Sequence, residues 1–239
     1  MKKAIKNFLT DAFPEVIMIL LNLILLKLFY GKLGTNIYAL YQIFSQFFAY
    51  LVLAEAGFSS CALVSLYKPM AENNIKEINK KLAGIRYIFR NIGIVILTLA
   101  VIISFIIPFT IKGNTFDYFY IVITFILYSI SNSVNYFFFT YRIYYDAREE
   151  KYVPNIVYQV GFIIKYIVEI ILLLLGASFE IVLIGCIICN LLTNFFMKQY
   201  TLKNEKNIKL DKNNKDTSMI NDTKDLIIHK ISGVIANNI

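Results

Sequence analysis

The sequence predicts an all-α integral membrane protein with about six transmembrane helices. Hydrophobic residues make up 58% of the chain, charged residues 17%, and the mean hydropathy is +0.61, all outside the range of ordinary soluble domains. A bilayer core roughly 30 Å thick takes about 20 apolar residues per helix, which leaves room for about six or seven spans. The stretch from Ile92 to Phe109 is apolar on every face, which favours helices over the alternating strands of a β-barrel.

Apolar runs between polar clusters give the expected spans. They are Phe13 to Tyr30, Ile37 to Leu66, Tyr87 to Ile111, Phe119 to Tyr141, Val153 to Leu175 and Phe179 to Gln199. No cleavage site of the kind that ends a signal peptide follows the first run, so we expect it to stay as an anchor. A last apolar run, Leu226 to Ile239, is too short to span and is either an interfacial helix or the start of a seventh span.

These runs predict three parts: a six-helix transmembrane unit over residues 1–200, a cytoplasmic linker over 201–222, and a final segment over 223–239, which the family resemblance given below makes the truncated start of a second lobe. The linker carries a lysine at every third position from Lys203 to Lys215, mixed with Asn and Asp. We interpret it as a solvated segment, with a lipid-binding strip as the alternative, since either would be attracted to anionic lipid.

The basic residues alternate between the predicted loops. Nineteen lie in the amino terminus and in every second loop after it, against Lys32 and Lys112 in the opposite loops. Cytoplasmic loops retain positive charge, so the pattern places the amino terminus in the cytoplasm and the protein in a bacterial-type inner membrane. The net charge of +8 is then a topology signal and not a nucleic-acid footprint.

The first long cytoplasmic loop has an amphipathic pattern. Ile75, Ile78, Leu82, Ile85 and Phe89 recur at three- and four-residue steps with Lys and Glu between them. This spacing predicts a helix over about 70–86 that lies on the inner leaflet and runs into the third span.

Charged and amide side chains inside the spans are the candidate site residues, because each charge costs a few kcal/mol to insert. Lys165 and Glu169 lie one helical turn apart on the face that carries Tyr158, where they form either a self-neutralising ion pair or the wall of a polar cavity. Glu55 lies too deep in the second span to reach the interface and should face protein or water. Asn132 and Asn135 in the fourth span, like Asn190 and Asn194 in the sixth, are either interhelical hydrogen-bond glue or cavity lining.

No motif in the sequence indicates an enzyme. The single histidine, His229, stands apart from any acidic cluster of metal-ligand spacing, and no phosphate loop or nucleophile elbow is present. Cys61, Cys186 and Cys189 lie within apolar stretches that offer nothing to lower a thiol pKa, so we interpret them as buried small hydrophobes. We therefore expect no cofactor and no metal, and a function in transport, binding or structure.

Four short segments resemble the Wzx-like polysaccharide repeat-unit flippases, within the superfamily that also holds the multidrug and toxin extrusion transporters. They are Leu33-Gly34 with Tyr38-Ala39-Leu40, Glu55-Ala56-Gly57-Phe58, Leu66-Tyr67-Lys68-Pro69, and Ile228-His229-Lys230-Ile231-Ser232-Gly233-Val234. Within Tyr38-Ala39-Leu40 the chain departs from the family, because Ala39 stands in place of the commoner Gly. The resemblance implies two six-helix lobes around a central cavity, of which this chain supplies one lobe and the start of the next.

By this resemblance the substrate is an isoprenoid-pyrophosphate-linked oligosaccharide moved from the cytoplasmic to the outer leaflet for cell-surface polysaccharide. Lys165, Asn132, Asn135 and Tyr158 are then expected to line its path, while Glu55 and Glu169 could carry coupling ions or protons. The expected partners are this substrate, membrane lipids, and the missing lobe or a second copy of the chain. The alternatives are an exporter of small amphipathic cations and a non-transporting component of a polysaccharide assembly complex.

Overall fold

The computed structural model describes residues 2–53, 55–111, 116–211 and 214–218. The expected interfacial or seventh helix, with His229, lies outside the described residues, as does the rest of 219–239. The elements in chain order are α1 (Lys2–Leu28), the π-helical turn η1 (Phe29–Leu33), α2 (Thr35–Leu53), α3 (Ala56–Ala71), α4 (Ile75–Ser104), α5 (Ile107–Thr110), α6 (Tyr118–Ala147), α7 (Tyr152–Leu174) and α8 (Phe179–Asn204).

The described part of the chain is all-helical, with no strand, as the sequence predicts. Within it, five helices are long and apolar enough to cross a membrane, or six if the bent pair α2 and α3 forms a single span. Local signals set their ends: Asn74 caps α4 by accepting a hydrogen bond from the Glu77 N–H (3.1 Å), and Asp117 caps α6 in the same way. Gly176, with φ at 77°, ends the helical path after α7.

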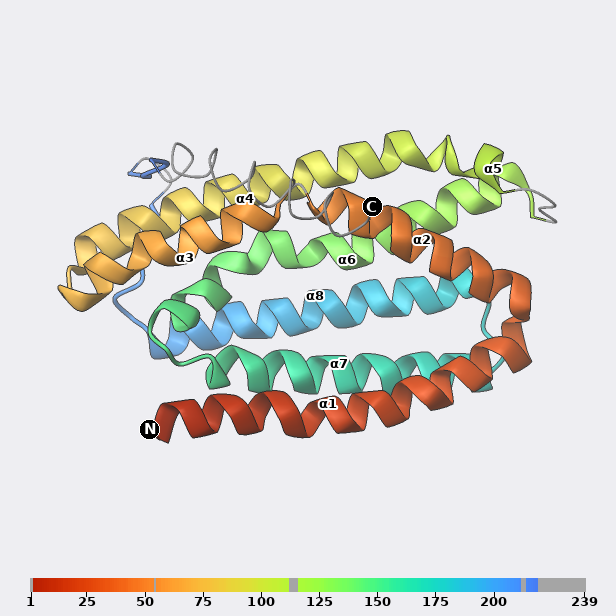
Figure 1. Ribbon diagram of the computed structural model, residues 1–239, viewed down its shortest axis with the longest axis horizontal. Helices are drawn as coiled ribbons and strands as arrows, with labels where there is room; N and C mark the ends of the chain where they lie inside the picture. Colours follow the sequence, from red (N-terminus) through yellow and green to blue (C-terminus); the bar gives the residue numbers. More distant parts are fainter. Residues whose placement is uncertain (1, 54, 112–115, 212–213, 219–239) are drawn as a thin grey trace, which may run out of the picture.

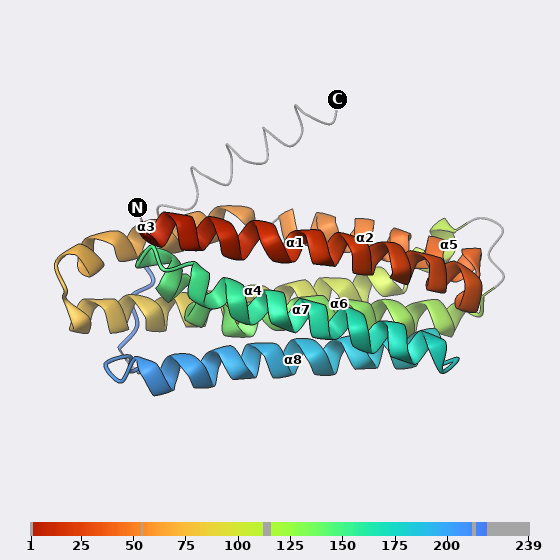
Figure 2. The ribbon, with the colours of Figure 1, turned by 90° about the horizontal axis from the view of Figure 1, so that it is seen from below.

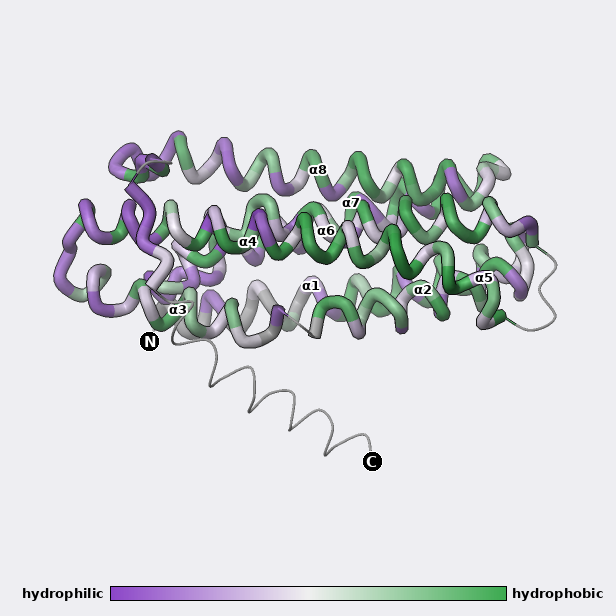
Figure 3. The backbone as a smooth tube through the Cα atoms, turned by 90° about the horizontal axis from the view of Figure 1, so that it is seen from above, coloured by the Kyte–Doolittle hydropathy of each residue, from purple (hydrophilic) through white to green (hydrophobic). Residues whose placement is uncertain are grey.

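The long helices run side by side along one axis (Figure 1). The amino terminus, the α3–α4 turn, the α6–α7 loop and the end of α8 all lie at one end, and η1, α5 and the α7–α8 loop lie at the other. Figure 3 shows hydrophilic residues gathered at the first of these ends and hydrophobic residues along the helices. The cation-rich loops therefore share one end of the bundle, as the alternation of charge requires.

The helices pack in the order α1, α7, α8, α6, α4, each against the next. Helices α1 and α2 lie on the same side of the bundle (Figure 2), meet at η1 and diverge from there toward the amino-terminal end (Figure 1). Residues of both helices line the candidate site described below.

The buried apolar residues of the described chain form two clusters along the bundle axis. The first cluster, near η1, contains Phe44, Phe125 and Phe179, and the second, near the amino-terminal end, contains Leu82 and Phe89. Between them α6 carries the polar residues Ser129, Ser131, Asn132, Ser133 and Asn135, and α8 carries Cys186, Cys189, Asn190, Thr193 and Asn194. We call this level of the bundle the polar belt.

Apolar side chains cover the outside of the helices. On α8, for example, Leu192 is 63% exposed and Phe196 60%, and on α4 Val95 is 55% exposed. Such a continuous apolar surface is stable only in lipid, because it would otherwise drive association in water.

The predicted second span is not one straight helix. It is divided into α2 and α3 at Glu55, and the axes of the two helices differ by 48°. The prediction of one continuous span from Ile37 to Leu66 is therefore corrected, because an apolar run does not reveal a change of helix direction within it.

The amphipathic stretch of the first cytoplasmic loop is the first part of α4 and runs into the third span, as the spacing predicts. What covers its apolar face differs from the prediction. Leu82 and Ile85 are fully buried in the second apolar cluster, among residues of α3, α6 and α8. Protein, and not the inner leaflet, therefore covers this face, although Ile75 at its start stays exposed.

The predicted linker is not a freely solvated segment in its described part. Residues 205–211 and 214–218, which we call the returning segment, fold back along α4. Ile208 is buried in the second apolar cluster, and Asn79 donates to the Asn207 carbonyl (2.9 Å) and accepts from the Lys209 N–H (3.0 Å). The sequence offered no sign of this docking, because most of its contacts are to the backbone.

Asp216 holds the far end of the returning segment to α4. Its N–H donates to the Lys80 carbonyl (3.1 Å) and its carboxylate forms an ion pair with Lys81 (2.7 Å). The hydrogen bond from Lys81, together with those from Ser218, holds the pKa of the Asp216 carboxyl well below its usual range. A lowered folded-state pKa means that this contact is fully present at neutral pH and is lost only as the pH falls through that pKa.

The orientation of the bundle is testable with reporter fusions. We expect fusions after Lys6, Lys80, Lys151 and Lys212 to report the cytoplasm, and fusions at Lys32, Asn114 and Ala177 to report the outside, because basic loops are retained on the cytoplasmic side. An external signal from the Lys80 or Lys212 fusion would contradict this topology.

Candidate functional site

The space between α1 and α2 contains two adjoining pockets at the level of the polar belt. The larger has a volume of about 210 Å³ and the smaller about 30 Å³, and Phe29, Tyr41, Lys165 and Glu169 line both. Residues of α1 and α2 complete the larger pocket, while α6 and α8 complete the smaller one. We call the two together the α1–α2 cleft.

The Lys165–Glu169 pair of α7 lies in this cleft. The Lys165 ammonium is 4.0 Å from Glu169 Oε1, and the two side chains are 22% and 9% exposed. Glu169 also accepts a hydrogen bond from the Cys186 thiol (2.9 Å), whereas the rings of Phe162 and Tyr166 lie 5.5 and 5.4 Å from the Lys165 ammonium. A 4.0 Å separation is too long for a hydrogen bond, so the ammonium keeps its donor capacity for a further acceptor.

Asn132 of α6 lines the smaller pocket together with this pair. Its side-chain N–H donates to the Tyr128 carbonyl of the preceding turn (2.8 Å). Three of the six predicted site residues, Lys165, Glu169 and Asn132, therefore come together in one place although they lie on two helices.

Asn135 and Tyr158 line neither pocket but belong to a hydrogen-bond network of the polar belt. Buried Asn194 of α8 donates to Asn135 Oδ1 (2.8 Å) and accepts from the Tyr158 hydroxyl (3.0 Å), so one side chain joins α6, α7 and α8. In addition, Asn190 donates to both oxygens of Ser131. Of the two interpretations left open for the asparagines, interhelical glue describes Asn135, Asn190 and Asn194.

Glu55 lies apart from the cleft, at the break between α2 and α3. It accepts a hydrogen bond from the Ser59 hydroxyl, and the Tyr136 hydroxyl of α6 lies near its carboxylate. These contacts turn it toward protein, as expected from its depth, but it does not share a pocket with Lys165.

Sequence reasoning missed several residues that line the cleft. Asn22 of α1 and Gln42 of α2 are polar, exposed and part of the larger pocket, and Tyr41 lines both pockets. Asn22 and Gln42 each interrupt an apolar run, and that signal could have identified them. The role of Cys186 as a donor to Glu169 depends on the packing of α7 against α8 and has no local signal.

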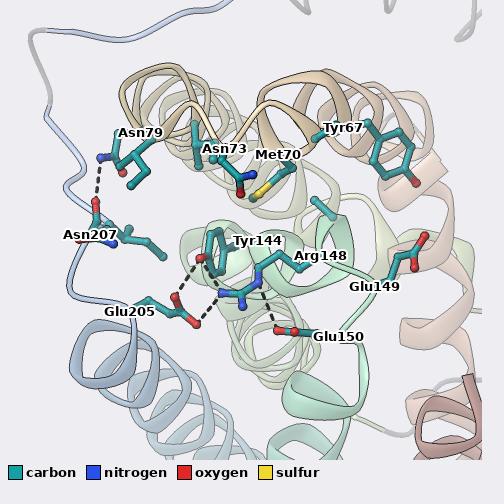
Figure 4. A pocket seen from close by; sticks show the side chains of 15 residues that line it. Tyr67, Met70, Asn73, Asn79, Tyr144, Arg148, Glu149, Glu150, Glu205 and Asn207 are labelled. Atoms are coloured by element: carbon teal, nitrogen blue, oxygen red, sulfur yellow. Dashed lines mark hydrogen bonds and ion pairs between the residues drawn. The ribbon is translucent and has the colours of Figure 1, made fainter. Parts of the chain in front are cut away.

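A pocket of about 760 Å³ lies at the amino-terminal end of the bundle, where α3, α4, α6 and the start of the returning segment meet (Figure 4). Four of its polar groups are bonded to one another: Arg148 donates to Glu205 (2.7 Å) and to the Tyr144 hydroxyl (2.9 Å), and it pairs with Glu150 (3.2 Å). The Tyr144 hydroxyl in turn donates to Glu205 (3.0 Å). This network ties the ends of α6 and α8 together, which is a structural role.

Comparisons of the chain with family models, curated proteins and solved structures find no match. The fold and the apolar surface define its class, which is an α-helical multi-pass membrane protein.

The polar belt gives a stability prediction at Asn194. Asn194→Leu should destabilise the protein by about 1–3 kcal/mol, because Tyr158 and Asn135 each lose a buried partner. The lower part of this range is expected if the polar side chains find other hydrogen-bond partners in the unfolded state within the membrane. Chemical unfolding in mixed micelles measures the change, and Asn204→Leu, at an exposed position of the same helix, should leave the midpoint unaltered.

Proposed function

We propose that the chain forms one wall of a membrane translocation path for isoprenoid-pyrophosphate-linked oligosaccharides. The observation that carries the proposal is the Lys165 ammonium, placed in a cleft of a membrane bundle and only loosely paired with Glu169. Inserting a cation at this depth costs free energy, so an intramembrane lysine usually marks a functional position. Binding an anionic substrate in the cleft is a function that matches its positive charge.

The groups around Lys165 suit the head of such a substrate. Asn132 and Gln42 offer amide groups, and Tyr41 and Tyr166 offer aromatic surfaces for a sugar ring. A volume of about 210 Å³ holds only the charged head, so the rest of the glycan would extend out of the cleft. The exposed apolar face of α1, with Leu20 and Leu23, suits an isoprenoid chain.

Glu169 gives the cleft a means of releasing the anion. When a pyrophosphate occupies the cleft, the Lys165 ammonium turns from Glu169 to the phosphate oxygens, and the Cys186 thiol still donates to the carboxylate. When the substrate leaves, the ion pair re-forms. Glu55 is a candidate for a coupling ion or proton at a separate position, the break between α2 and α3.

A binding comparison tests this function. The full chain in lipid nanodiscs should bind an isoprenoid-pyrophosphate-linked sugar more tightly than the same lipid-linked sugar without phosphate, and it should not bind a cationic amphiphile of equal chain length. Preferential binding of the cationic amphiphile would contradict the proposal and favour a multidrug-type exporter. Binding of neither ligand would favour a non-transporting component of an assembly complex.

A further inference from the structure

A second basic pocket lies outside the cleft, where the returning segment crosses α4. It has a volume of about 240 Å³ and is lined by Arg86, Tyr87 and Arg90 of α4 and by Leu210, Asp211 and Lys215 of the returning segment. Three cations face one carboxylate, so the pocket is electropositive.

The pocket is built by specific contacts and not by chance proximity of surface lysines. The ion pair of Asp216 with Lys81 fixes the chain next to Lys215, and the Lys215 ammonium lies 3.5 Å from the centre of the Tyr87 ring. Ile208, buried in the second apolar cluster, holds the part of the returning segment that precedes Leu210 and Asp211. The position of Lys215 opposite the two arginines therefore depends on tertiary structure.

The face of α4 that carries the arginines continues as an apolar surface. Arg86, Arg90 and Ile94 follow one another at four-residue steps, which aligns them along the helix. Ile94 is 46% exposed, and Val101, two turns further, is 41% exposed. A phosphate at the arginines would thus be followed, in the direction of the bundle centre, by a surface suited to acyl chains.

We propose that this pocket binds the phosphate headgroup of an anionic membrane lipid, whose acyl chains lie along the exposed face of α4. Guanidinium groups are suited to phosphate because their donors match two oxygens at once. The location of the pocket also suits a lipid headgroup, because basic pockets at the cytoplasmic ends of membrane helices attract anionic headgroups. The site is independent of the cleft and of the substrate proposed for it.

Native mass spectrometry of the full chain tests the site, with phosphatidylglycerol and phosphatidylcholine of identical acyl chains as probes. We expect wild type to retain phosphatidylglycerol at least about tenfold better than phosphatidylcholine. The triple variant Arg86→Gln, Arg90→Gln, Lys215→Gln should lose this preference. The matched control Lys68→Gln, Lys203→Gln, Lys206→Gln removes three exposed cations from the same end of the bundle and should keep it.

Equal loss in both triple variants would overturn the proposal, because it would mean that total charge and not the pocket attracts the lipid. Retention of the preference by the pocket variant would overturn it as well. If the triple variant does not fold, Arg90→Gln alone decides, because the Arg90 side chain is exposed and should be dispensable for folding. A competition experiment separates the lipid from a free anion as the ligand. Excess inorganic phosphate should fail to displace the bound phosphatidylglycerol, and full displacement would identify a free anion as the ligand instead.

Discussion

If the chain forms one wall of the proposed translocation path, export of lipid-linked glycan in the presence of the second lobe should fall roughly 10- to 150-fold when Lys165 is replaced by alanine. This range corresponds to the loss of one charge-assisted contact of about 1.5–3 kcal/mol in a partly dry site. The Lys165 side chain is 22% exposed and 4.0 Å from Glu169, so its ammonium is both shielded from bulk water and available to a phosphate. Lys27→Ala, at an exposed position of α1, is the matched control and should leave export unchanged.

The single variant alone does not separate substrate binding from structure, because it leaves Glu169 buried without its cation and repels an anionic substrate. The double variant Lys165→Ala, Glu169→Ala separates them. If the pair is only structural, removing both charges should restore export, because no uncompensated charge stays behind. If Lys165 binds the anion, export stays impaired while the protein remains inserted and folded. Normal export by a well-expressed double variant would remove Lys165 from the site.

Gly84→Ala should release the returning segment from α4. A Cβ added at Gly84 would overlap the carbonyl oxygen of Asp216 and lie 2.6 Å from its carbonyl carbon, and both are backbone atoms that no rotamer change can move. The segment would have to retreat by roughly 1.5 Å or more to reach van der Waals distance. That movement would break the hydrogen bond from the Asp216 N–H to the Lys80 carbonyl (3.1 Å).

Limited trypsin digestion measures this release, since the returning segment carries Lys206, Lys209 and Lys215. Cleavage there should be at least about tenfold faster in Gly84→Ala than in wild type, because local opening no longer has to precede it. Gly31→Ala is the matched control: its Cβ would meet nothing within 4 Å, and cleavage should be unchanged. Slow cleavage in Gly84→Ala would mean that the segment is held by its other contacts.

The helices could be predicted from sequence because lipid imposes a simple rule on apolar length. The predicted start of the sixth span, Phe179, is the first residue of α8, and the fifth span agrees with α7 within one residue at each end. The same rule cannot reveal the break at Glu55, because a straight helix and a broken one satisfy it equally.

Part of the candidate site was also predictable. The four-residue spacing of Lys165 and Glu169 placed them on one face of α7, and their depth indicated that they turn inward. Which asparagines face the cleft was not predictable. Asn132 and Asn135 are less than one turn apart, and only the position of α8 decides that Asn135 bonds to Asn194 while Asn132 lines the smaller pocket.

The polar belt lies between two apolar clusters that hold different parts of the same bundle. Helix α2 packs in the first cluster and α3 in the second, and the chain changes direction at Glu55, where one part gives way to the other. Hydrogen bonds between asparagines are directional and can exchange partners, whereas interlocked phenylalanine rings resist shear. The belt thus joins two separately packed apolar clusters through directional contacts, at the level where α2 gives way to α3, while α4, α6 and α8 run unbroken through both halves.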